Sequence, residues 1–168
     1  MTPRHFESHA EVAASPAELF ALLDDHSRLS AHMTKRSWMM AGSRITLETD
    51  ANRGRAVGSR IRLSGRILGF ELSVDEVVTE REPPHAKAWQ TLGSPRLLVI
   101  GPYRMGFRIE AVQAGSRLTV FIDWTPPSGA LARLFGPSYA RWCTERMARD
   151  ALAHFAQDGK GLTSSGPR

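Results

Sequence analysis

The sequence predicts an α+β domain in which a curved, seven-stranded antiparallel sheet wraps around one long C-terminal helix, with two short helices after the first strand. Apolar residues alternate with polar ones over residues 44–125, which is the pattern of half-buried strands. The connections between these segments are too short for crossover helices, so neighbouring strands should be antiparallel. Residues 130–157 place apolar side chains at helical spacing along one stripe. A half-apolar sheet and an amphipathic helix are expected to cover one another.

Length and composition are those of one globular domain. The chain has 168 residues, of which 42% are apolar and 23% charged. We expect one domain over residues 1–157 and a flexible Gly/Ser-rich tail over residues 158–168. No apolar run reaches the ~18–20 residues of a membrane span, and the N-terminus lacks the apolar core of a signal peptide. The single cysteine, Cys143, excludes an internal disulfide and a cysteine-based zinc site. We therefore expect a cytoplasmic protein.

The basic residues are scattered and do not form a nucleic-acid footprint. The net charge is +5, and 19 of the 22 basic residues are arginine. The densest group, over residues 53–66, alternates with apolar residues as the solvent-facing side of a strand would. No nucleic-acid partner is predicted.

The N-terminal part predicts a strand followed by two short helices. Residues 5–14 form an extended run with weak alternation. Ser15 is a helix cap, Pro16 suits the first helical position, and Glu18 completes a capping box, so a helix should begin at Pro16. A break follows, and a second short helix is expected over residues 28–32.

Six further strands and one long helix account for the next 110 residues or so. The strands are expected near residues 44–49, 60–67, 70–78, 85–92, 103–111 and 117–124. A longer loop should begin at Gly93. Pro137 lacks an N–H group, so a helical turn or two should precede it and the main helix should start close to it. The inward stripe of that helix includes Tyr139, Trp142, Cys143 and Met147.

Several segments resemble the START-like or SRPBCC superfamily of helix-grip proteins, which includes polyketide cyclase/dehydrase-like and lipid-transport members. The similar segments are residues 11–24, with the strand end and capping box, the hairpin at residues 115–120, and the long terminal helix. The stretches at residues 38–40 and 136–142 look like those of a bacterial subgroup. The resemblance spans residues 5–157 and implies the helix-grip fold, with an apolar cavity between sheet and helix. Members bind lipids, polyketides, quinones or hormones, and they differ in activity.

The candidate ligand-binding residues are aromatic, methionine and acidic side chains expected on the interior side of the sheet and the helix. Each has an alternative interpretation as ordinary packing. The predicted set is Trp38, Met39, Glu76, Trp89, Tyr103, Met105, Phe107, Tyr139 and Trp142.

Glu76 is the most informative carboxylate because it shares the apolar parity of Leu72, Val74 and Val78. If it is buried, it should pair with an arginine. It is therefore either a polar group for a ligand or a salt-bridged or strand-end residue.

No catalytic, cofactor or metal residues are predicted. The chain lacks a Gly-x-Ser-x-Gly nucleophile motif, and residues 54–58 lack the Lys-Ser/Thr of a phosphate loop. The six histidines show no metal-binding spacing, and His5 and His9 lie about 13 Å apart along a strand. Cys143 is expected to be an inert core thiol.

The leading interpretation is non-catalytic binding of a small hydrophobic molecule, lipid-, polyketide- or quinone-like, in the apolar cavity. The alternative is a polyketide cyclase/aromatase or dehydratase-type enzyme that uses Tyr103, Tyr139, Glu76 or an inward arginine at the cavity base. A third interpretation is a partner-binding module with an exposed apolar patch. The ligand and the oligomeric state do not follow from the sequence.

Overall fold

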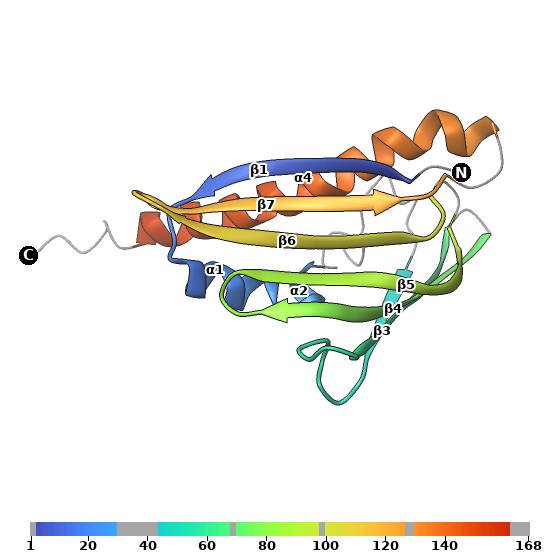
Figure 1. Cartoon of the computed structure of the whole chain (residues 1–168), viewed down its shortest axis with the longest axis horizontal. Helices are drawn as coiled ribbons and strands as arrows, with labels where there is room; N and C mark the ends of the chain where they lie inside the picture. The colour runs from blue at the N-terminus through green and yellow to red at the C-terminus, as the bar shows by residue number, and fades with distance from the viewer. Residues whose placement is uncertain (1–2, 30–43, 68–69, 98–99, 127–129, 162–168) are drawn as a thin grey trace, which may run out of the picture.

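The computed structural model describes residues 3–29, 44–67, 70–97, 100–126 and 130–161. One sheet and one long helix dominate it (Figure 1). The elements in chain order are β1 (Arg4–Val12), α1 (Pro16–Leu23), α2 (His26–Leu29), β2 (Arg44–Thr49), β3 (Arg60–Ile67), β4 (Phe70–Glu82), β5 (Ala86–Arg96), β6 (Tyr103–Val112), β7 (Gly115–Trp124) and α4 (Ala130–Gly161). The predicted α+β class, seven-stranded sheet and long C-terminal helix are confirmed.

The sheet is antiparallel throughout, in the order β1-β7-β6-β5-β4-β3-β2. The strands from β2 to β7 follow one another along the chain, and β1 joins the far side by pairing with β7. The long helix α4 packs against β1 and β7 and runs along them (Figure 1). We call the face of the sheet toward α1 and α4 the inner face. One of its rows is Phe6, Ile122, Met105, Trp89 and Val78 across five strands.

The capping box predicted at the start of α1 is present. Ser15 Oγ accepts the backbone N–H of Glu18 at 3.3 Å, and the Glu18 carboxylate accepts the backbone N–H of Ser15 at 2.9 Å. After this eight-residue helix the structure has one four-residue helical turn, α2. Residues 30–32 of the predicted second helix lie outside the described residues.

Two boundaries differ from the prediction. β5 continues to Arg96, where a loop was expected from Gly93. The pairing of β4 with β5 shifts register between Ser73 and Asp75, and Gly93 has a φ of 65°, so a glycine-containing irregularity lies inside the strand. α4 also continues through Pro137 without a break. A proline removes one helical hydrogen bond, and packing of the helix on both sides of it favours continuation.

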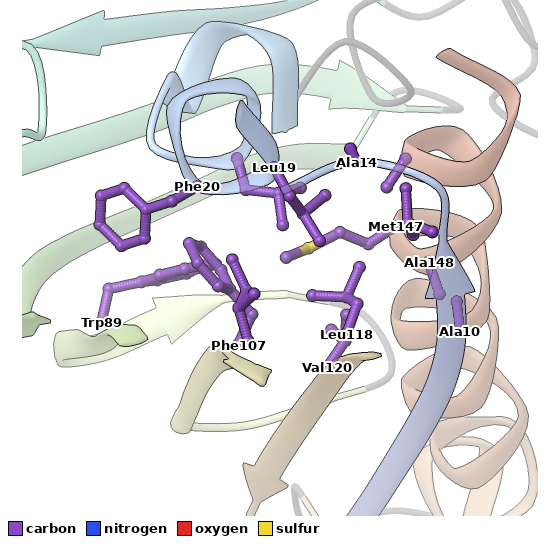
Figure 2. Packing of buried hydrophobic residues seen from close by; sticks show 14 residues of the cluster. Ala10, Ala14, Leu19, Phe20, Trp89, Phe107, Leu118, Val120, Met147 and Ala148 are labelled. Carbon is purple, nitrogen blue, oxygen red and sulfur yellow. The ribbon is translucent and has the colours of Figure 1, made fainter. Parts of the chain in front are cut away.

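The main core lies between α1, the sheet and the C-terminal half of α4 (Figure 2). Met147 of α4 reaches toward Leu19 of α1 and Leu118 of β7. The rings of Phe20 and Phe107 pack edge to face with centroids 5.7 Å apart. This part of the inner face is filled by protein side chains.

A buried charge cluster attaches the end of α1 to the sheet. Lys87 of β5 is 0% exposed, and its Nζ donates to the backbone oxygen and to Oδ1 of Asp24, each at 2.9 Å. Arg81 of β4 donates from Nε to Asp24 Oδ1 at 3.2 Å and from a terminal nitrogen to Oδ2 at 2.8 Å. Burial lowers the pKa of Lys87; burial alone would raise the pKa of Asp24, but the two cations lower it on balance. The sequence gave Lys87 no role.

One aromatic residue is buried on the opposite, outer face. Phe121 lies under the guanidinium groups of Arg104 and Arg108, which are 5.1 and 4.8 Å from its ring centroid. Gly106 lies directly across from it, and a Cβ there would come within 2.8 Å of the Phe121 ring and 2.5 Å of the Lys87 carbonyl oxygen. Glycine is therefore required for this close approach.

Within the described residues, no helix combines the length and apolar content that crossing a membrane requires.

Asp24→Asn should destabilise the fold by about 3–5 kcal/mol, because it leaves the buried Lys87 ammonium without its counter-charge. The measurement is urea unfolding followed by circular dichroism. The matched control is Asp75→Asn, which breaks the exposed pair with Arg62 and should cost less than about 1 kcal/mol. Equal losses in the two variants would contradict the anchoring role of Asp24.

Candidate functional site

A buried carboxylate lies on the inner face at the centre of the candidate site. Glu76 of β4 is 2% exposed and pairs across the sheet with Thr91 of β5. Thr91 Oγ1 in turn accepts the backbone N–H of Tyr103 of β6 at 3.2 Å. The phenol of Tyr103 donates a hydrogen bond to Glu76 Oε1. Strand alternation thus brings Glu76 and Tyr103 together from strands on either side of β5.

His26, the first residue of α2, approaches the same carboxylate. Its side chain is 3% exposed, and its Nε2 lies 3.5 Å from Glu76 Oε2. The His26 ring also packs edge to face on Trp89, with centroids 4.8 Å apart. Asp24 is only two residues earlier, so the Lys87–Asp24–Arg81 cluster fixes the backbone that places His26 against the sheet.

The polar atoms of this site are incompletely satisfied. Among the described residues, no hydrogen-bond partner is found for Glu76 Oε2 or His26 Nδ1. A buried carboxylate is costly unless it is paired. The arginine expected to pair with a buried Glu76 is not among its described contacts, which are the Tyr103 hydroxyl and the His26 ring.

Beside this carboxylate lies a half-buried aromatic and thioether surface. Tyr103, Met105 and Tyr139 pack against a small buried cluster that includes Ile122 and Trp124. On α4, Tyr139 is followed one turn later by Trp142, with ring centroids 5.9 Å apart. We call the half-buried side chains Tyr103, Met105, Tyr139 and Trp142 the aromatic surface.

Both tyrosines of the site act as hydrogen-bond donors. Burial, together with the charge and hydrogen bond of Glu76, raises the pKa of Tyr103 well above 10. The nearby Cys143 thiol and burial do the same for the pKa of Tyr139. Neither phenol is ionised near neutral pH, so the group that can accept a proton or a cation here is Glu76, with His26 beside it.

The remaining predicted residues lie in different places. Trp38 and Met39 lie outside the described residues. Trp89 is buried between the main core and His26. Phe107 is fully buried against Phe20.

The sequence analysis missed His26. The only signal for it was its position at the break after the first helix, and no local spacing links it to a strand residue 50 positions later. Within the part of the chain that the structure describes, no three histidine, cysteine, aspartate or glutamate side chains are grouped to hold a metal ion.

The fold and the comparisons with known proteins agree. A family model described as polyketide cyclase / dehydrase and lipid transport matches residues 3–159. The chain belongs to this family. The resemblance to the SRPBCC superfamily is thereby confirmed. No curated protein sequence matches the chain.

Solved structures with the same fold share little sequence with this family member. Norcoclaurine synthase from Thalictrum flavum is 16% identical, with a TM-score of 0.64 and coverage of 90% of this chain and 86% of the synthase. The major latex-like protein 151 from Panax ginseng is 10% identical, with a TM-score of 0.63 and coverage of 92% and 99%. The two-domain ARO/CYC protein StfQ of the steffimycin biosynthetic pathway is 13% identical, with a TM-score of 0.65 and coverage of 95% and 53%. At these identities the likeness shows the fold alone.

The thiol of Cys143 should be unreactive in the folded protein. Burial raises its pKa to about 12, so almost no thiolate exists at pH 8, and the side chain is also shielded from reagents. We expect negligible reaction with 5,5′-dithiobis(2-nitrobenzoic acid) at pH 8 and one reactive thiol per chain in guanidinium. Fast reaction of the folded protein would show that the packing around Tyr139 and Cys143 opens in solution.

Proposed function

We propose that the protein binds a small, largely apolar molecule against the inner face of β4, β5 and β6, beside α4. One observation carries this proposal: a buried carboxylate with an unpartnered oxygen lies next to the half-buried aromatic surface. Ligand sites commonly combine an apolar lining with a few convergent polar groups. Membership of a family described by lipid transport and polyketide cyclisation supports the same class of ligand.

The apolar body of the ligand would contact the aromatic surface. Nearer α1 the inner face is fully packed, as at Phe107 and Val120. Met105 retains accessible surface although it lies in the same strand face as Phe107. A methionine among aromatic rings provides an adaptable wall. In this proposal Phe107 is a core residue, and Trp89 supports the wall behind His26.

The polar end of the ligand would be oriented by Glu76, Tyr103 and His26. These side chains come from β4, β6 and α2, so their relative position depends on the whole fold. A single polar contact inside an apolar site fixes the direction in which an elongated molecule enters.

A second candidate function is an enzyme of the cyclase/aromatase or dehydratase type. The observation that favours it is the 3.5 Å approach of His26 Nε2 to Glu76 Oε2, beside the Tyr103 hydroxyl. Such a group supplies both a proton acceptor and a proton donor within one site. In that case His26→Gln would abolish turnover and leave ligand binding largely intact, whereas a carrier would show no turnover to lose.

Binding can be measured with Nile red, a neutral apolar dye that becomes fluorescent in apolar sites. We expect saturable binding to the native protein and roughly tenfold weaker binding to Tyr139→Ala, which removes a large part of the aromatic surface. The matched control is Leu152→Ala, a substitution of an exposed residue on the same helix, which should bind as the native protein does. Absence of saturable binding, or equal affinity of the native protein and Tyr139→Ala, would contradict the proposal.

A further inference from the structure

The two buried carboxylates of the protein have very different charge environments. Asp24 is held by two cations, Lys87 and Arg81, at hydrogen-bond distance. Glu76 is buried more deeply, yet among the described residues no lysine or arginine lies within ion-pair distance of it. Its only basic neighbour there is the His26 ring at 3.5 Å, which is longer than a normal hydrogen bond. The fold therefore supplies cations to one carboxylate and withholds them from the other.

The hydrogen-bond inventory of Glu76 leaves one oxygen available. Oε1 accepts from the Tyr103 phenol, while Oε2 has no hydrogen bond among the described residues. A carboxylate oxygen accepts hydrogen bonds and cannot donate them when ionised. A ligand group at Oε2 must therefore be a donor, and a carboxylate or phosphate group would be repelled.

The rings around the carboxylate favour a cationic donor over a neutral one. Trp89 packs against His26, Tyr103 contacts Glu76 directly, and Tyr139 lies close enough for its ionisation to be influenced by Glu76. Aromatic faces carry partial negative charge and attract ammonium groups. A buried ion also gains most when its partner carries the opposite charge.

We propose that the molecule bound by this protein is a hydrophobic amine whose protonated nitrogen pairs with Glu76 Oε2. This inference rests on the proposed function and specifies the ligand class for the same site. The apolar body lies on the aromatic surface, and the ammonium group supplies the cation that the described residues do not. Tyr103 is a positioning residue, since its hydroxyl holds the carboxylate through Oε1.

The test is a series of three ligands that share a phenylbutyl body and differ at the end group: 4-phenylbutylamine, 4-phenylbutan-1-ol and 4-phenylbutyrate. Their affinities for the full chain are measured at pH 7.5 by isothermal titration calorimetry. We expect the amine to bind roughly tenfold or more tightly than the alcohol, because a charged hydrogen-bonded partner is favoured over a neutral one, and the acid to bind weakest.

Glu76→Gln tests the assigned atom directly, since it keeps the shape of the side chain and removes its charge. The amine should lose roughly tenfold in affinity, and the alcohol should change by less than about threefold. The matched control is Glu80→Gln on the same strand, where the carboxylate pairs with Arg104 on the outer face and all three affinities should stay unchanged. The end-group series on the native protein remains decisive if Glu76→Gln does not fold.

Each result separates this inference from the proposed function. An alcohol that binds as tightly as the amine, or an amine preference that survives in a folded Glu76→Gln, would overturn the amine assignment while ligand binding itself stands. Tightest binding of the acid would overturn the amine assignment in the same way. If none of the three ligands binds, the amine assignment fails, and Nile red binding then decides whether the proposed function fails with it.

Discussion

The Asp24 carboxylate, held between Lys87 and Arg81, is the contact on which the arrangement of the inner face depends. It joins the last turn of α1 to β4 and β5 through charges that are costly to bury separately. His26 lies two residues beyond this anchor and so is held against Glu76 and Trp89. One ionic cluster thus stabilises the fold and positions a polar group of the candidate site.

The inner face has two parts with different physical roles. Around α1 and the C-terminal half of α4, side chains such as Leu19, Phe107 and Met147 are packed together and bury apolar area, which stabilises the domain. Toward Tyr103 and Tyr139 the packing is less complete, and a buried carboxylate lies beside it. α4 contributes to both parts, so the same helix stabilises the core and forms one wall of the candidate site.

The family fixes the frame more firmly than the chemistry. Structures that share 10–16% of their residues with this chain superpose over most of its length. Function must therefore come from side chains grafted on the frame. In this protein the distinctive group is the Glu76 carboxylate with a tyrosine donor, a histidine neighbour and no described lysine or arginine partner.

The sequence by itself determined the strand alternation, the capping box before α1, the long final helix and the inward parity of Glu76 and Tyr103. These features follow from local periodicity and local hydrogen bonding, which short segments encode. Only the tertiary structure decided that α4 continues through Pro137, that Lys87 is buried on Asp24, and that His26 meets Glu76. Such contacts join residues about 50 or more positions apart or rest on long-range packing. Strand register and helix placement decide them, and no local pattern records either.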